Sequence, residues 1–266
     1  MAVAAEPPDM IEGAAINLSL GGKPILKDVT VGLHPGELLA VCGPNGAGKS
    51  TLLSALAGEH ALCAASVRYE GTAANKLSTM QLSKRRVVLE QSPTLSAEFT
   101  LTELVELGAP IGVAPEEMDA LTTPILTMLG LWDMKDRYVS ELSGGQRHKA
   151  HLARILTQLH GNRQMGHRCH VFLDEPTASL DISQQAVVLK AMQRLTREGV
   201  GVLVVLHDLN LAAGFADRVI LMREGRVLYS DVPSAVLTEE RLTDTYETPI
   251  LVETASSGQM IIQPRF

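Results

Sequence analysis

The chain has 266 residues and a formal net charge of −7, and 45% of its residues are apolar while only 3% are aromatic. This length can bury a full α/β core, as one large domain or two small ones, and that core has to be built mainly from aliphatic side chains and methionine. The acidic balance argues against a generally basic surface, so we expect no nucleic-acid partner.

Targeting signals and disulfides are not predicted. The N-terminal residues have no basic start and no long apolar stretch, which disfavours a secretion signal. The most apolar run, residues 202–206, is far too short to span a bilayer. The three cysteines, Cys42, Cys63 and Cys169, show no C-x-x-C spacing, so we expect free thiols in a soluble, intracellular protein.

The first half of the chain predicts an antiparallel β section that leads into a nucleotide-binding strand. Residues 16–20 alternate between apolar and polar, and residues 24–31 follow across a Gly21-Gly22 turn. The apolar run 37–41 then predicts a buried strand, and residues 50–57 predict a helix.

A phosphate-binding motif lies between this strand and this helix. Every fixed position of G-x-x-x-x-G-K-[S/T] is matched by Gly43, Pro44, Asn45, Gly46, Ala47, Gly48, Lys49, Ser50 and Thr51. The glycines let successive N–H groups point at phosphates, Lys49 is suited to the outer phosphates, and the Ser50 hydroxyl to Mg²⁺. A chance glycine-rich turn is disfavoured because the motif and both flanking elements agree.

The middle of the chain changes from a predicted strand to predicted helices. Residues 86–89 predict a strand, and Gln91 follows it, where it could reach a metal or water, although such a glutamine is usually just solvated. In the connection 91–99, Pro93, Leu95 and Phe99 predict a partner contact, unless they pack under their own helix. Residues 100–103 form a capping box, and 115–129 predict a helix that Pro124 kinks or splits into two.

A second glycine-containing motif starts the next helix. Ser143, Gly144, Gly145 and Gln146 form a possible anion site, although alone they could be only a helix cap. The polar stretch 160–170 carries three histidines and a cysteine. Its spacing fits no common zinc pattern, so we expect a solvated surface loop rather than a metal site.

Carboxylates and a histidine follow two further buried strands. Residues 171–173 lead into Asp174, a candidate Mg²⁺ ligand, and Glu175, a candidate for polarising the attacking water. A turn at 179–181 precedes a helix, and strand 202–206 ends at His207, on the edge where open α/β sheets place ligands. Residues 219–222 and 226–229 predict a closing hairpin.

The chain resembles the ATP-binding subunit of ABC transporters over nearly its whole length. The resemblance rests on the order and spacing of six features: the phosphate loop, Gln91, residues 142–146, 171–175, 179–181 and His207. The resemblance implies an α/β fold with a P-loop NTPase (RecA-like) core, an antiparallel β section and an inserted helical subdomain. The implied boundaries within the single domain 1–266 are core 10–92 and 160–240, helical subdomain 93–159 and C-terminal tail 241–266.

The resemblance also implies an ATPase that uses ATP and Mg²⁺ and works as a head-to-tail homodimer. Ser143, Gly144, Gly145 and Gln146 would contact the neighbour's nucleotide, and Asp181 would lie at the dimer interface. Glu175 would be the catalytic carboxylate, His207 the γ-phosphate contact and Gln91 the metal and water sensor. Where the family commonly stacks an aromatic residue on adenine, this chain has Leu20, so base selectivity is expected to be loose.

Within the family the chain is similar to importer subunits for haem, cobalamin and ferric siderophores, through residues 20–26, 99–108 and 236–250. Leu20 and the polar stretch 160–170 favour hemin. The implied partners are an integral membrane permease dimer and a periplasmic substrate-binding protein, at the cytoplasmic face of the cell membrane. A soluble ABC ATPase of iron–sulfur cluster assembly, with a soluble scaffold as its partner, is the alternative from another class.

Overall fold

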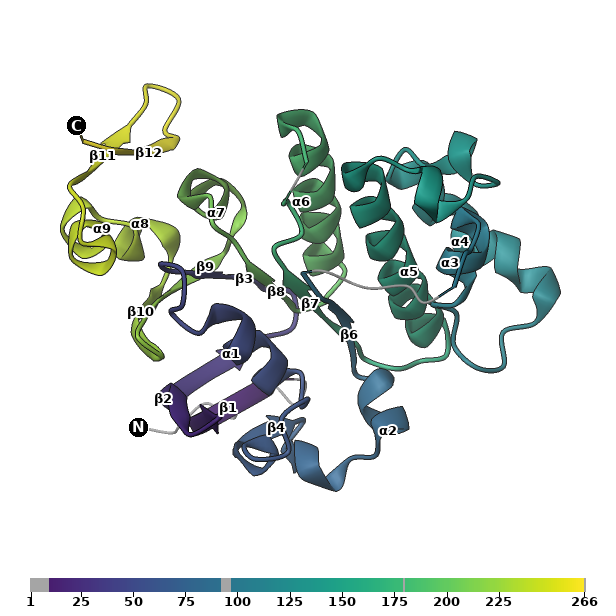
Figure 1. The fold of residues 1–266 in the computed structure, drawn as a ribbon, viewed down its shortest axis with the longest axis horizontal. Helices are drawn as coiled ribbons and strands as arrows, with labels where there is room; N and C mark the ends of the chain where they lie inside the picture. Colours follow the sequence, from purple (N-terminus) through teal and green to yellow (C-terminus); the bar gives the residue numbers. More distant parts are fainter. Residues whose placement is uncertain (1–9, 92–96, 179, 266) are drawn as a thin grey trace.

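A six-stranded sheet lies at the centre of the structure, a computed structural model that describes residues 10–91, 97–178 and 180–265 (Figure 1). The strand order is β10-β9-β3-β8-β7-β6, parallel throughout except for β10, which pairs antiparallel with β9. The strands are β3 (Leu38–Cys42), β6 (Arg86–Leu89), β7 (His170–Asp174), β8 (Val202–Val205), β9 (Arg218–Arg223) and β10 (Arg226–Asp231). Parallel strands end at one edge, so the segments that follow them meet there.

The predicted antiparallel β section is confirmed as a separate four-stranded sheet of order β2-β1-β4-β5. Its strands are β1 (Ile11–Leu20), β2 (Lys23–Leu33), β4 (Val67–Tyr69) and β5 (Thr72–Ala73). The Gly21-Gly22 turn joins β1 to β2 and places Leu20 opposite Lys23. The predicted closing hairpin is also confirmed, as β9 and β10.

Nine α-helices, four 3₁₀ turns and a C-terminal hairpin complete the described part of the chain. The helices are α1 (Lys49–Leu56), α2 (Thr79–Ser83), α3 (Leu101–Glu106), α4 (Pro115–Met128), α5 (Gly144–Gln164), α6 (Ile182–Arg197), α7 (Leu209–Phe215), α8 (Pro233–Val236) and α9 (Glu239–Tyr246). The 3₁₀ turns are η1 (Ala64–Ser66), η2 (Ala74–Lys76), η3 (Trp132–Met134) and η4 (Val139–Glu141). The hairpin is β11 (Ile250–Thr254) and β12 (Met260–Pro264).

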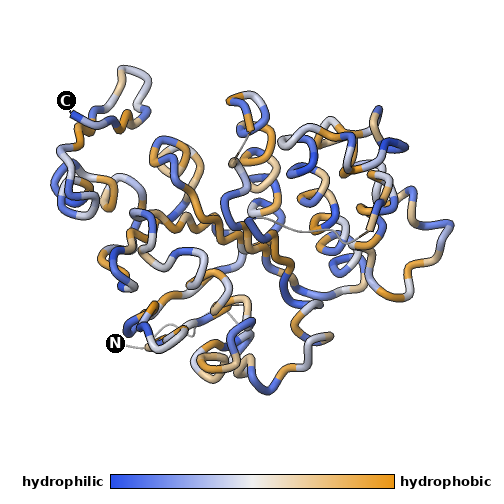
Figure 2. Tube along the Cα trace, in the orientation of Figure 1, coloured by the Kyte–Doolittle hydropathy of each residue, from blue (hydrophilic) through white to orange (hydrophobic). Residues whose placement is uncertain are grey.

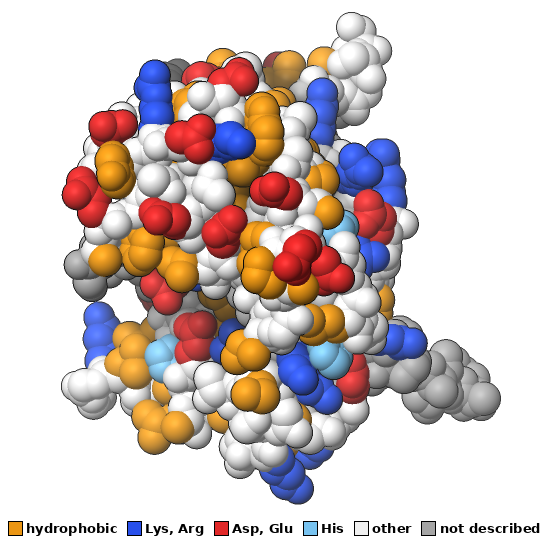
Figure 3. Space-filling view, turned by 90° about the vertical axis from the view of Figure 1, so that its right-hand side faces the viewer, with side chains coloured by type: hydrophobic (Ala, Val, Ile, Leu, Met, Phe, Trp, Pro, Cys, Tyr) orange, Lys and Arg blue, Asp and Glu red, His pale blue; other side chains and the backbone are white. Residues whose placement is uncertain are grey.

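Helices α3 and α4 project beside α5 on one side of the molecule, the face that Figure 3 presents. The predicted capping box is present: Thr100 accepts from the Glu103 backbone, and the Glu103 side chain accepts from the Thr100 N–H. Pro124 does not split its segment, because α4 is one helix with Leu121 and Ile125 buried. Proline removes one N–H donor, and burial of this apolar face offsets that loss.

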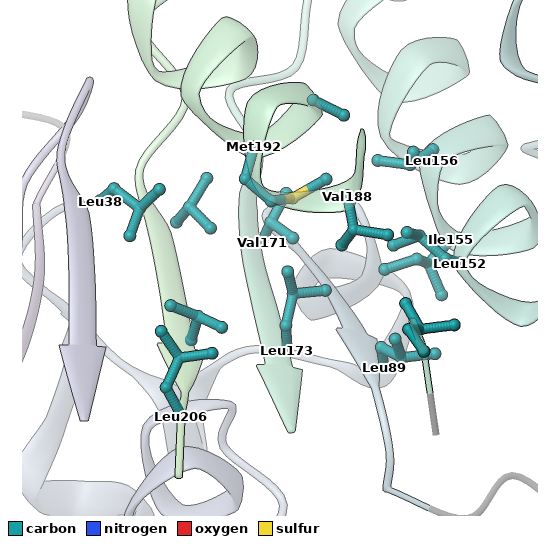
Figure 4. Packing of buried hydrophobic residues seen from close by; sticks show 14 of the residues in the cluster. Leu38, Leu89, Leu152, Ile155, Leu156, Val171, Leu173, Val188, Met192 and Leu206 are labelled. Carbon is teal, nitrogen blue, oxygen red and sulfur yellow. The ribbon is translucent and has the colours of Figure 1, made fainter. Parts of the chain in front are cut away.

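Strand alternation divides the core into two clusters, one on each face of the central sheet. In β3, Leu38 and Ala40 belong to the cluster that α5 and α6 cover, whereas Leu39 and Val41 belong to the cluster beneath α1 and the antiparallel sheet. Figure 4 shows the first cluster, and Figure 2 shows the central strands as a continuous apolar band. All residues of β3, β7 and β8 are buried, as expected for parallel strands covered on both faces.

The predicted surface loop at 160–170 is wrong for most of its length. Helix α5 continues to Gln164, past the predicted boundary between residues 159 and 160. Asn162 is buried and donates from Nδ2 to the Ser83 carbonyl at 2.8 Å, while Cys169 is buried and His170 already belongs to β7. Long-range contacts to the segment before β6 therefore order residues whose composition is typical of a loop. The three cysteines are free, as predicted.

Candidate functional site

The phosphate loop curls between β3 and α1. Gly43 has φ 146°, and a Cβ there would come within 2.2 Å of the Met222 carbonyl oxygen, so a larger residue cannot take this position without displacing β9. Lys49 is buried, and its Nζ donates to the carbonyls of Gly43 (2.8 Å) and Pro44 (3.0 Å). Burial lowers the pKa of Lys49, while the nearby Glu175 carboxylate acts in the opposite direction and raises it. The loop thus holds an ammonium group that phosphate oxygens can bind.

The Ser50 hydroxyl donates to Asp174 Oδ1 at 3.1 Å and so joins the start of α1 to the end of β7. Asp174 is buried, and burial raises the pKa of its carboxyl while the Ser50 hydrogen bond lowers it. Oxygen ligands on neighbouring elements are the set that Mg²⁺ prefers. Of the three sequence-predicted metal ligands, Ser50 and Asp174 therefore lie together, and Gln91 contacts Glu175, the residue after Asp174.

Glu175 lies between the other two predicted catalytic side chains. Its Oε2 accepts from Gln91 Nε2 at 2.8 Å, and its Oε1 is hydrogen-bonded to His207 Nε2. Glu175 has φ 52°, a left-handed conformation that is uncommon for a residue with a side chain. Its side chain is 15% exposed, against 46% for His207. The ends of β6, β7 and β8 thus bring one carboxylate, one amide and one imidazole into contact.

These groups line one cavity of about 760 Å³. Its lining consists of Lys23, Ile25, Asn45, Gly46, Ala47, Gly48, Lys49, Ser50, Thr51, Gln91, Glu175 and His207. Lys23 and Ile25 were not identified as site residues from the sequence, although both lie within three residues of the Gly21-Gly22 turn. Leu20, which was expected to lie against the adenine base, is 41% exposed and does not line this cavity.

The second motif lies apart from this cavity. Ser143 caps α5 in a capping box with Gln146, and Ser143 and Gly144 are exposed. Asp181 caps α6 by accepting from the Gln184 N–H at 2.9 Å, and bonds from Ser183 and Gln184 lower the pKa of its carboxyl. Of the predicted turn at 179–181, residue 179 lies outside the described part. Neither the residues 143–146 nor Asp181 line the cavity of their own chain.

The predicted partner contact at 91–99 can be traced only in part. Pro93 and Leu95 lie outside the described residues. Phe99 is half-buried and packs against the main core, and its carbonyl accepts from the Val139 N–H at 2.9 Å. For Phe99, packing under its own helix is therefore the better interpretation.

Comparison with known proteins identifies relatives over most of the chain. The ABC transporter family model matches residues 26–178. The hemin import ATP-binding protein HmuV of Deinococcus radiodurans is 43% identical over 239 residues, 89% of this chain and 90% of that protein. The protein of the same name from Rhodopseudomonas palustris is 37% identical over 254 residues, 96% of this chain and 94% of that protein.

Solved structures share the fold. An inward-facing metal-chelate-type ABC transporter aligns with a TM-score of 0.78 at 21% identity, covering 97% of this chain and 98% of that one. A bacterial ABC transporter cassette solved as a dimer aligns with a TM-score of 0.69 at 25% identity, covering 84% of this chain and 98% of that one. The predicted α/β P-loop NTPase fold is confirmed, and the chain belongs to the ABC transporter family, among its ATP-binding subunits.

Proposed function

We propose that the chain is the ATP-hydrolysing subunit of an ABC importer that energises hemin uptake through a membrane permease. The observation that carries the ATPase activity is the convergence of Lys49, Ser50, Glu175 and His207 on one cavity, with Asp174 hydrogen-bonded to Ser50 behind it. Hemin as the cargo is supported by the relatives, since those of 35–43% identity over most of the chain carry the name hemin import ATP-binding protein.

The residues of the cavity fit the chemistry of phosphoryl transfer. Lys49 and the loop N–H groups would bind the phosphates, and Glu175 would polarise the attacking water. Gln91 and His207 hold the Glu175 carboxylate from two sides, which fixes where that water is activated. Ser50 and Asp174 would hold Mg²⁺, which neutralises charge on the phosphates.

A homodimer would complete the site. The exposed Ser143 and Gly144 start the 21-residue helix α5, whose N–H groups and dipole favour an anion. Because they do not line the cavity of their own chain, we infer that they contact the nucleotide bound by a second subunit, with Asp181 at the interface. Hydrolysis would then favour opening of the dimer, which links ATP turnover to motion.

The permease is proposed to dock in a groove of about 370 Å³ between α2, the segment after α3 and the C-terminal end of α5. Apolar side chains surround it, with Met80 60%, Leu107 58% and Ile111 91% exposed. Such a cluster on a surface with otherwise interspersed charges (Figure 3) favours an apolar partner element. None of the described helices could span a bilayer. From the names of the relatives, which are import ATP-binding proteins, we place the subunit at the cytoplasmic face beneath the permease.

The first experiment asks whether the chain is a transport ATPase. The chain is to be purified from detergent-solubilised membranes together with what it binds, and ATP turnover of the complex measured. Recovery with an integral membrane protein is expected. Recovery only with soluble proteins would instead favour the alternative hypothesis of a soluble ABC ATPase of iron–sulfur cluster assembly.

The second experiment identifies the cargo. Cells that lack the chain are complemented with the wild-type chain or with Glu175→Gln. They are then grown with hemin, a ferric siderophore or a free iron salt as the iron source. Growth that depends on cobalamin is tested separately. Wild type should restore growth on hemin and Glu175→Gln should not. Restoration confined to cobalamin or to the siderophore would replace hemin with that cargo. A periplasmic substrate-binding protein in the same system would be sought by its hemin affinity.

A further inference from the structure

The C-terminal segment contacts α7, which follows His207, and the start of the phosphate loop, although it lies beyond residues 26–178 that the family model matches. Ile250 and Ile262 of the β11–β12 hairpin belong to the main core cluster, and Val252 and Met260 pack against it. In Figure 1 the hairpin and α9 lie beyond α7, on the side of the sheet formed by β9 and β10. The segment is therefore an integral part of the fold.

Asn210 fastens this hairpin to α7 with two hydrogen bonds. Its Nδ2 donates to the Ile262 carbonyl at 3.1 Å, and its Oδ1 accepts from the Ile262 N–H at 2.8 Å. Both polar atoms of the amide thus pair with one residue of β12, in the way that a neighbouring strand would. A side chain with only one of these functions cannot make both bonds.

Helix α7 starts at Leu209, two residues after His207. Asp208 caps the helix and accepts at Oδ1 from the N–H groups of Asn210 (2.8 Å) and Leu211 (3.2 Å). His207 itself is nearly half-exposed, and its described polar partner is Glu175. His207 lies in the short connection between the end of β8 and the seven-residue helix α7, and its half-exposed side chain has little packing of its own, so the placement of α7 helps to set the placement of His207.

The same segment also reaches the phosphate loop. The Tyr246 hydroxyl, at the end of α9, is buried close to the Cys42 thiol and the Gly43 backbone, and burial raises the pKa of Tyr246. Arg223 at the end of β9 donates from Nη1 to the Asp244 carbonyl at 2.8 Å and pairs with Glu247. The end of α9 is thereby tied to the strand that adjoins Gly43.

We propose that Asn210 is a positioning residue for ATP hydrolysis: by fixing the C-terminal hairpin to α7, it holds His207 against Glu175. Asn210 does not line the cavity and so acts through His207. This inference rests on the ATPase activity proposed above.

The test compares wild type, Asn210→Ala, His207→Ala and the double variant in ATP turnover by the full chain. For Asn210→Ala, kcat should fall about three- to tenfold, the change that loss of one or two hydrogen bonds corresponds to. KM for ATP should stay within about twofold, because the phosphate loop keeps its contacts. In the His207→Ala background, Asn210→Ala should cause no further loss, because both substitutions remove the same interaction.

Asn17→Ala is the matched control. Asn17 also bridges two backbone segments, donating to the Ala15 carbonyl and accepting from the Asp28 N–H, but in the antiparallel sheet. It should leave kcat unchanged. Amide hydrogen exchange of residues 207–215 in the absence of nucleotide gives a second readout, and Asn210→Ala should speed it while Asn17→Ala should not.

Equal loss of kcat in both backgrounds, or unchanged exchange in 207–215, would overturn the positioning role of Asn210. A wild-type chain without ATP turnover would overturn the proposed function, whereas normal wild-type turnover with an unaffected Asn210→Ala would overturn this inference alone.

Discussion

The Gln91 amide donates to the Glu175 carboxylate at 2.8 Å, across 84 positions of sequence. The other Glu175 oxygen meets His207, so the ends of three parallel strands share one carboxylate. A base held by two partners is ordered before any substrate arrives.

Glu175→Gln tests this arrangement directly. The amide keeps the shape of the side chain but cannot polarise water, so ATP turnover should fall by about 10²–10⁴-fold, as expected for a lost general base. ATP affinity, measured by equilibrium binding, should change little. The control is Glu224→Gln, an exposed glutamate with a similar φ of 50° that lies outside the cavity. Near-normal hydrolysis by Glu175→Gln would remove Glu175 from its assigned role.

Base selectivity should be loose, because Leu20 has no π face and does not line the cavity. GTP should be hydrolysed within roughly tenfold of ATP, a difference of about 1.4 kcal/mol, which is in the lower part of the range of about 1–3 kcal/mol that one apolar contact discriminates. Leu20→Tyr should lower KM for ATP by about two- to tenfold, the range that one aromatic stacking contact supplies. Leu62→Tyr adds the same ring at another exposed leucine and should have no effect. A strong wild-type preference for ATP would mean that another residue reads adenine.

Permease binding should depend on the apolar groove. Ile111→Ser and Leu107→Ser, at two exposed side chains, should weaken recovery of the permease in a pull-down and lower permease-stimulated ATP turnover. The fold and the basal ATP affinity should persist, because neither side chain is buried. Val232→Ser, at a 49% exposed valine near β10, is the control. Leu95→Ser extends the series to the 91–99 connection. If both groove variants bind the permease normally, the docking surface lies elsewhere.

Acid should destabilise the chain through His151. This side chain is buried in α5, and neither of its ring nitrogens is hydrogen-bonded to any described residue. Burial lowers its pKa to about 4, and Arg154, His148 and Arg147 act in the same direction. The unfolded chain binds the proton more tightly, so the contribution to stability is complete above pH 6.5 and is lost as pH falls toward 4.

His151→Leu removes that group at similar volume. Between pH 7 and pH 5, the free energy of unfolding should fall by about 2 kcal/mol less than in wild type, as measured by urea titration. His160→Gln, an exposed histidine on the same helix, should keep the wild-type slope. Identical slopes for wild type and His151→Leu would show that His151 is not the acid-sensitive group. Buried His170, with its pKa also lowered to about 4 by burial, should contribute in the same pH range.

The sequence alone determined the elements and the chemistry that local spacing encodes. The phosphate loop between β3 and α1, the caps at Thr100 and Ser143, and the buried strands β7 and β8 all follow from periodicity and short motifs. These features depend on neighbours within one turn or one strand, so composition and spacing are enough to predict them.

Tertiary structure decided which distant groups meet. The pairing of Gln91 and His207 with Glu175 depends on the order β8-β7-β6, and burial of Asn162, Cys169 and His170 depends on contacts with other parts of the chain. Polar composition at 160–170 predicted a loop, yet long-range hydrogen bonds and the start of β7 override it. The Asn210–Ile262 contact joins residues 52 positions apart, and no local pattern encodes it because its energy comes from packing of the whole C-terminal segment.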